Sequence, residues 1–226
     1  MAKAPYKLPN VFVGCPYSGK FKFNQFKAAL DRLPFKWFYA DTTLNTKHLL
    51  GILRSYIKAA DYCLFDISTW NPNVALEIGL AEGEDVEYYI LLDRRLTSGV
   101  PADIQGIQRI EYASYGYERD DLVPLLTKYL VREHTHLRNV WEGLGGGEKR
   151  DVKYYLALSF LAHLRDFSRL SPDDIRMLSK GTYLRKEAQQ EVLALLADLG
   201  LISSINSTRG AVAKRNLYKD DIRIGK

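Results

Sequence analysis

The segment between Asp66 and Glu77 contains two carboxylates in surroundings that suggest chemistry. Asp66 stands where the short apolar run 62–65 ends, and Glu77 is the only charged residue from Val74 to Ala81. Isolating one carboxylate among aliphatic side chains costs free energy unless the group is paired or faces a polar cleft. A carboxylate held in a cleft can serve as a nucleophile. Glu77 is therefore the first residue whose position needs an explanation.

Strand and helix patterns alternate from residue 11 to about residue 134. Apolar runs of strand length are separated by stretches with apolar residues at helical spacing, and parallel strands need such crossover helices. The expected strands are 11–14, 36–40, 62–67, 88–92 and 107–112, and the expected helices are 24–33, 46–60, one starting at Pro72, and 120–131. This alternation predicts an α/β fold with a flavodoxin-like five-stranded parallel sheet, order 2-1-3-4-5, flanked by helices.

With that strand order, a ligand would bind beyond the carboxyl ends of strands one and three, where the order reverses. The loops at this point are 14–20 and 66–73. Helices follow both loops, so their N-terminal N–H groups could hold an anion such as a phosphate. Asn71 is suited to cap the second helix. Glu77 lies one turn beyond Asn73 on the same helix face, so both side chains can point toward the first loop.

Three consecutive motifs resemble the nucleoside 2-deoxyribosyltransferase-like and related TIR-like families. They are Phe65-Asp66-Ile67-Ser68, Asn71-Pro72-Asn73-Val74 and Glu77-Ile78-Gly79-Leu80-Ala81. The later stretch 100–106, followed by 110–112, is similar to the final strand of these families and its approach. The resemblance covers roughly residues 10–133.

The resemblance implies that Glu77 attacks the sugar C1′ of an N-glycoside while the base leaves, after which the sugar passes to water or to a second base. Asp66 would hydrogen-bond ribose hydroxyls or position the base. The other implied substrate contacts are Gly14, Cys15, Pro16, Tyr17, Ser18, Ser68, Asn71 and Asn73. The implied substrate is a nucleoside, a nucleotide, a deoxynucleotide or NAD⁺, and the reaction needs no cofactor and no metal.

The first strand departs from the family pattern. Well-studied transferases carry a tyrosine there beside the nucleophile, and the matching position in this sequence is Phe12. Tyr17 could supply the missing hydroxyl. The departure favours hydrolysis of the glycoside over exchange of its base.

The first loop also matches part of a phosphate-binding P-loop. Residues 14–20 fit the pattern Gly-x-x-x-x-Gly-Lys, and 64–66 resemble a Walker-B strand end. Phe21 stands where a Ser or Thr would hold Mg²⁺. We also expect Asn24 to cap the next helix. The helix would then start too late for the lysine of the motif to lie in its first turn. Both points argue against a P-loop NTPase.

A glycine-rich run at 143–147 suggests a linker between two domains. We predict a nucleoside deoxyribosyltransferase-like/TIR-like domain over 8–134, a linker over 135–150 and a second, small and mostly helical domain over 151–226. The second domain has expected helices at 152–167, after Ser171 and at 185–199, followed by a hairpin around 206–210. This order is typical of a winged helix. The combination resembles effectors of retron-type and other antiphage defence systems, whose toxicity comes from destroying nucleotides.

The net charge of +5 is concentrated in the predicted second domain. Residues 151–226 hold 13 Lys/Arg against 9 Asp/Glu, and within 207–226 the count is 6 against 2. A winged helix places one helix in the major groove and its wing along the backbone. The nucleic-acid contacts that this would suggest are Arg185, Arg209, Lys214 and Arg215. The alternatives are a protein partner or a solvated basic tail.

Composition indicates a cytoplasmic globular protein. Charged residues make up 26% of the chain, and no run approaches the roughly 18 apolar residues of a membrane span. Cys15 and Cys63 show no metal-ligand spacing and are expected to be reduced core thiols. A homo-oligomer is expected, because family members often complete the site from a neighbouring subunit. The alternative to the enzyme is a nucleotide-sensing module or a DNA-binding regulator without catalysis.

Overall fold

A computed structural model of the chain describes residues 8–16, 20–39, 49–69, 71–96, 106–113, 121–167, 169–206 and 210–213. Within these ranges the chain forms two compact units. The sheet unit comprises 9–30 and 36–126, and the C-terminal unit comprises Leu8, 31–35 and 127–213. The second unit is therefore assembled from separate stretches of sequence.

The sheet unit is built on five parallel strands. They are β1 (Asn10–Gly14), β2 (Lys36–Tyr39), β3 (Tyr62–Asp66), β4 (Tyr88–Asp93) and β5 (Arg109–Tyr112), hydrogen-bonded in the order β2-β1-β3-β4-β5. Every residue of β1 is buried, as expected for a parallel strand covered on both faces. The predicted sheet and its strand order are confirmed.

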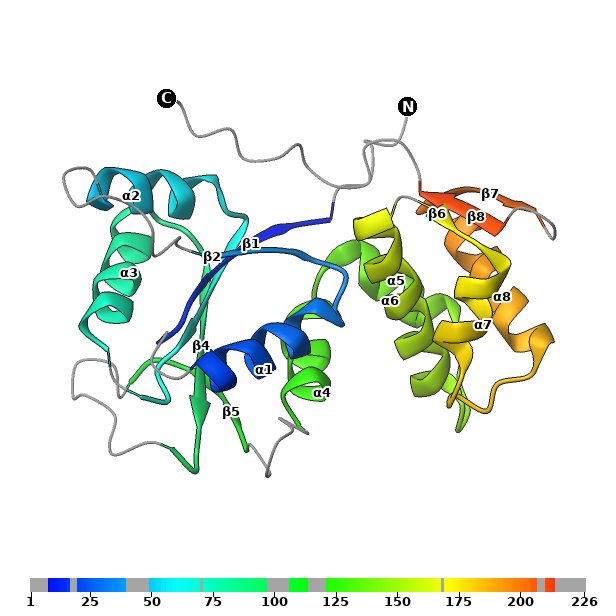
Figure 1. Cartoon of the computed structure of the whole chain (residues 1–226), viewed down its shortest axis with the longest axis horizontal. Coiled ribbons are helices and arrows are strands. Elements are labelled where there is room, and N and C mark those ends of the chain that lie inside the picture. The colour runs from blue at the N-terminus through cyan, green and yellow to red at the C-terminus, as the bar shows by residue number, and fades with distance from the viewer. Residues whose placement is uncertain are drawn as a thin grey trace. The chain divides into compact units, whose positions relative to one another are not determined.

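Helices cover both faces of this sheet. The helices α2 (Leu49–Ala59) and α3 (Pro72–Gly83) lie side by side on one face, and α1 (Lys20–Asp31) and α4 (Leu122–Leu126) lie on the other (Figure 1). Apolar side chains that face α2 and α3 form one core cluster, which includes Phe12, Leu53, Ile57, Cys63, Phe65, Val74, Ile78 and Ala81. This layering places the carboxyl ends of β1 and β3 beside the start of α3.

Helix α1 begins at Lys20, so the prediction that Asn24 caps it is wrong. Asn24 lies exposed within the helix. The ring of Phe23 packs edge-on against Tyr39 of β2, with ring centroids 5.4 Å apart, so the buried face of the helix extends one turn further than the capping preference suggests. The late helix start therefore no longer argues against a P-loop, whereas Phe21 in place of Ser or Thr still does.

The C-terminal unit is mostly helical and carries a small antiparallel sheet. Its elements are the π-helix η2 (Thr127–Val131), α5 (Thr135–Gly143), α6 (Arg150–Phe167), β6 (Arg169–Leu170), α7 (Pro172–Ser179), α8 (Lys186–Asp198), β7 (Ile202–Asn206) and β8 (Gly210–Ala213). The three strands pair in the order β6-β8-β7, which includes the predicted hairpin. Over the ranges that the structure describes, no helix is both long and apolar enough to cross a bilayer.

The segment 135–150, predicted as a linker, contains α5 and lies within the C-terminal unit. Leu137 and Val140 of α5 are buried, so this helix belongs to the core of the unit. The glycine run that suggested a linker makes the turn between α5 and α6, where Gly145 and Gly147 have φ angles of 67° and 113°. Such angles favour glycine, and they account for the run without a domain boundary.

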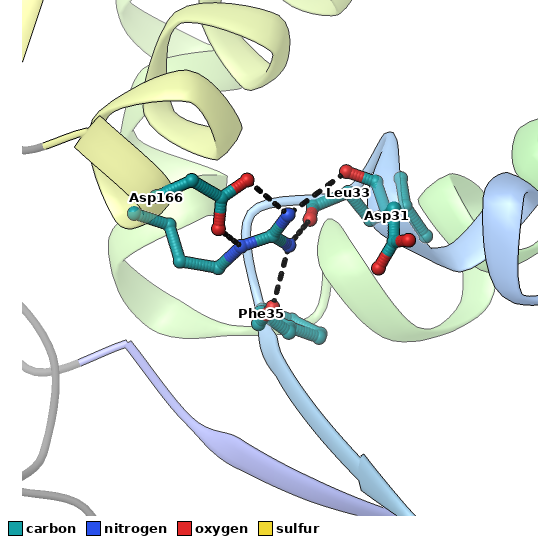
Figure 2. A network of polar contacts seen from close by, with 5 residues as sticks. Asp31, Leu33, Phe35 and Asp166 are labelled. Atoms are coloured by element: carbon teal, nitrogen blue, oxygen red, sulfur yellow. Dashed lines mark hydrogen bonds and ion pairs between the residues drawn. The ribbon is translucent and has the colours of Figure 1, made fainter.

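Arg165 of α6 fixes the segment 31–35 within the C-terminal unit. Its guanidinium donates to the carbonyl oxygens of Leu33 at 2.7 Å, Phe35 at 2.9 Å and Asp31 at 3.1 Å (Figure 2). The Asp166 carboxylate accepts from the same guanidinium at 2.8 and 2.9 Å. Hydrogen bonds to a charged group are stronger than neutral ones, so this network holds the connection between α1 and β2 firmly against α6.

Candidate active site

The local sequence determines where α3 starts and therefore which of its side chains face the sheet. Asn71 is the N-cap, and its side-chain oxygen accepts a hydrogen bond from the Asn73 N–H at 2.8 Å. Pro72 occupies the first helical position, where no N–H is needed. From this start, Glu77 falls on the inner face of the helix and is only 5% exposed.

Glu77 packs against the end of β1 at Gly14, where an added side chain would force its neighbours to shift. A Cβ atom added to Gly14 would overlap the Glu77 Oε2 atom and would lie 2.6 Å from Cδ1 of Phe65. Gly14 pairs with Phe65 across the boundary between β1 and β3. The Glu77 carboxylate therefore lies at the switch point of the sheet, where open α/β sheets bind ligands.

The environment of Glu77 disfavours its ionised form. Burial raises the pKa of Glu77 to about 7. Its Oε2 atom is inaccessible to solvent and has no hydrogen-bond partner among the described residues. Burial, followed by the charge of Glu77, raises the pKa of the neighbouring Cys63 thiol to about 12, so Cys63 is a neutral thiol at physiological pH. A carboxylate that changes its charge near pH 7 is a candidate for catalysis.

Asp66 has the opposite environment, because several donors satisfy its carboxylate. The N–H and the hydroxyl of Ser68 both donate to Oδ1, the first at 2.9 Å. The Tyr112 hydroxyl donates to Oδ2 at 2.8 Å. Ser68 Oγ also accepts from the Asp93 N–H at 2.7 Å, which ties the group to the end of β4. Asp66 thus belongs to a buried polar network that joins the ends of β3, β4 and β5.

The two predicted catalytic carboxylates lie on opposite faces of the sheet. Side chains alternate along a strand, so Cys63 and Phe65 point one way while Leu64 and Asp66 point the other. Cys63 and Phe65 face α2 and α3, where Glu77 lies. The structure therefore places Asp66 and Glu77 at the same edge of the sheet but on different faces of it.

The other predicted substrate contacts have varied positions. Gly14 contacts Glu77, Cys15 is buried, Pro16 is half-buried, Ser68 belongs to the Asp66 network, Asn71 caps α3 and Asn73 is exposed. Tyr17 and Ser18 lie outside the described residues, as does most of the predicted motif 100–106. Phe12 is buried and packs edge-on against Phe65, with ring centroids 6.2 Å apart.

Two members of the site region were not predicted from sequence. Tyr112 and Asp93 are fully buried at the ends of β5 and β4, and both join the Asp66 network. Tyr112 stands at the last position of the predicted strand 107–112, and Asp93 directly follows the predicted strand 88–92. Where the structure describes side chains, no group of three or more His, Cys, Asp or Glu is arranged to hold a metal ion.

In the C-terminal unit, Arg185 is exposed and occupies the N-cap position of α8. The other predicted nucleic-acid contacts, Arg209, Lys214 and Arg215, lie outside the described residues.

The sequence matches no protein-family model and no curated protein.

Alanine substitutions at two glycines should change stability in opposite directions. Gly14→Ala should lower the free energy of unfolding by about 1–3 kcal/mol, because the new methyl group overlaps Glu77 and Phe65. Gly79→Ala is the matched control within α3, where an added Cβ meets no atom within 4 Å, and should raise stability by up to about 1 kcal/mol. Urea denaturation measures both. Equal effects of the two substitutions would contradict the close packing at Gly14.

The raised pKa of Glu77 predicts a pH-dependent stability. Below about pH 4.5 the group is protonated in both folded and unfolded chains; between 4.5 and about 7 the folded chain binds more protons. Stability is therefore lost as the pH rises from about 4.5 to about 7, by about 3 kcal/mol in total. The advantage of Glu77→Gln over the parent should grow by this amount between pH 4 and pH 8.

Urea denaturation at a series of pH values measures this difference. Glu82→Gln removes an exposed carboxylate from the same helix and should change stability by less than about 0.5 kcal/mol at either pH. A Glu77→Gln effect that is constant over this pH range would show that Glu77 ionises normally.

Proposed function

We propose that the sheet unit cleaves the N-glycosidic bond of a nucleoside, a nucleotide, a deoxynucleotide or NAD⁺, with Glu77 as the nucleophile. The observation that carries the proposal is the position of Glu77 at the switch point, buried against Gly14 with a pKa of about 7. Fold-stabilising carboxylates are normally paired, whereas a desolvated carboxylate at a ligand-binding edge is suited to react.

The proposed reaction has two steps. The ionised Glu77 carboxylate attacks C1′ of the sugar, and the base leaves with the electron pair of the broken C–N bond. A nucleobase takes a proton from solvent as it leaves, whereas the nicotinamide of NAD⁺ leaves as a neutral molecule and needs none. Water then attacks the same carbon of the glycosyl ester, releases the free sugar and restores the carboxylate. No step requires a cofactor or a metal.

Hydrolysis is the favoured outcome in this proposal. Phe12 lies on the face of the sheet where Glu77 packs, and it has no hydroxyl to hold or orient an incoming base. Water needs no such docking group, so the second step goes to water more readily than to a second base. A nucleotide sensor without catalysis is the alternative, in which the same edge binds a nucleotide and the carboxylate does not react.

Base release should depend on ionised Glu77. Purified protein incubated with NAD⁺, nucleosides and deoxynucleoside monophosphates should release free base, and Glu77→Gln should lower the rate by at least about a thousandfold. The value of kcat/KM should rise with pH with a midpoint near 7, because attack requires the carboxylate form. Chromatography of the free base measures the rate. Tight nucleotide binding without any base release would support the sensor instead.

We further propose that the C-terminal unit is a winged helix that binds nucleic acid. Its helices α6, α7 and α8 and the hairpin of β7 and β8 follow one another in the order that such a domain requires. At the start of α8, Arg185 and Lys186 are exposed and Tyr183 is 93% exposed. Cations and an open aromatic ring suit phosphates and bases respectively.

Nucleic-acid binding through this unit should weaken with salt, because phosphate contacts release counterions. Duplex DNA and single-stranded RNA should shift in a gel at low salt, and replacing Arg185, Arg209, Lys214 and Arg215 by Ala should reduce both the affinity and its salt dependence. Arg138→Ala, which removes an exposed arginine from α5, is the matched control. Binding that is insensitive to these four changes would exclude the proposed surface.

In the cell, the proposed enzyme is a cytoplasmic, homo-oligomeric effector of bacterial antiphage defence that acts by depleting nucleotides. The resemblance of its sequence motifs supports this role. Loss of nucleotides in cells that express the parent chain but not Glu77→Gln would be its signature.

A further inference from the structure

A buried polar cluster at the ends of β3, β4 and β5 has no part in the chemistry assigned to Glu77. Its members are Asp66, Ser68, Asp93 and Tyr112, and none of them is more than 4% exposed. Two carboxylate-bearing residues in such a place are costly, because desolvating charged groups is unfavourable even when they are well paired. Apolar residues would close this edge of the sheet at a lower cost.

The cluster controls the turn that leads from β3 into α3. The Ser68 N–H and hydroxyl both donate to Asp66 Oδ1, which closes the chain over 66–68. Three residues after Ser68, Asn71 caps α3, and Glu77 follows on the second turn of that helix. The position of the Glu77 carboxylate along the sheet therefore depends on how the turn at 66–68 is held.

Hydrogen bonds from the ends of β4 and β5 hold this turn in place. The Asp93 N–H at the end of β4 donates to Ser68 Oγ at 2.7 Å. The Tyr112 hydroxyl at the end of β5 lies 2.8 Å from Asp66 Oδ2 and 3.3 Å from Ser68 Oγ. The Arg94 N–H donates to the Tyr112 carbonyl at 3.0 Å, so the ends of β4 and β5 are also joined to each other. Tyr112 thus connects the far side of the sheet to the turn before α3.

We propose that Tyr112 and Asp66 are positioning residues for Glu77, and that they act by fixing the β3–α3 turn rather than by touching the sugar. This inference rests on the proposed glycosidase function. It gives Asp66, whose carboxylate lies on the opposite face of the sheet from Glu77, a role that its hydrogen bonds explain. It also explains why a tyrosine, rather than an aliphatic residue, ends β5.

Tyr112→Phe tests the inference with little change in volume, because it deletes only the hydroxyl that donates to Asp66. Tyr88→Phe is the matched control: it lies on the adjacent strand β4, and its hydroxyl donates to the Glu82 carboxylate at 2.9 Å on the surface. Both variants lose one tyrosine–carboxylate hydrogen bond, and only the first loses it within the cluster.

Tyr112→Phe should lower kcat by about tenfold or more while KM changes less than about threefold, because a small displacement of the nucleophile affects the reaction more than binding. The pH midpoint of kcat/KM should also move below 7, as a displaced Glu77 gains access to water. Tyr88→Phe should leave all three values within about twofold of the parent. Circular dichroism and the thermal midpoint confirm that both variants are folded at the assay temperature.

Two outcomes would overturn the inference. If Tyr112→Phe matches Tyr88→Phe in kcat and in pH midpoint, the cluster has only a structural role. The second test is independent of turnover: the pKa of Glu77, followed by ¹³C NMR of its carboxyl carbon, should fall in Tyr112→Phe and not in Tyr88→Phe. An unchanged pKa would reject the positioning role even if the parent releases no base, whereas that absence of base release would reject the proposed function itself.

Discussion

The close approach of α3 to β1 at Gly14 is the constraint on which the candidate site depends. A helix that follows a parallel strand normally keeps its inner side chains over the face of the sheet. Here the missing Cβ at Gly14 lets a carboxylate lie directly against the strand end. In the order β2-β1-β3-β4-β5, β1 and β3 are neighbours whose following connections lead toward opposite ends of the sheet, so this contact falls at the switch point. One residue without a side chain therefore makes room for the Glu77 carboxylate at the end of β1.

Asp66 and Glu77 show how one sheet edge can hold two carboxylates in different environments. The Asp66 carboxylate accepts hydrogen bonds from Ser68 and Tyr112. The Oε2 atom of Glu77 is buried and lacks a hydrogen-bond partner in the described part of the chain, and burial raises the pKa of Glu77 to about 7. Such a division of environments is how enzymes assign separate roles to chemically similar groups. The folded state tolerates the cost at Glu77 because the rest of the sheet unit is conventionally packed.

Local patterns in the sequence were sufficient to predict the sheet and the start of α3. They were insufficient where contacts between distant segments determine the structure. The strand order and the cap at Asn71 follow from apolar periodicity and from short-range hydrogen bonding. Phe23 of α1 meets Tyr39 of β2, and Tyr112 donates its hydrogen bond to a residue 46 positions away. The two faces occupied by Asp66 and Glu77 could have been separated by counting the alternation along β3, had the pairing of Gly14 with Phe65 been known. The glycine run at 143–147 misled because a tight helix–helix turn and a linker have the same composition.

The Arg165 network has a consequence for how this protein can be inherited and rearranged. Because its guanidinium is satisfied by carbonyls of residues 31–35, the C-terminal unit is encoded by stretches of gene that lie nearly a hundred codons apart. No contiguous fragment carries the whole unit without also carrying residues 36–126 of the sheet unit. Recombination that joined residues 127–213 to another protein would transfer the Arg165 guanidinium with its Asp166 partner but without the three carbonyl oxygens of Asp31, Leu33 and Phe35. We therefore expect the two units to have been inherited together in one gene rather than exchanged separately between genes.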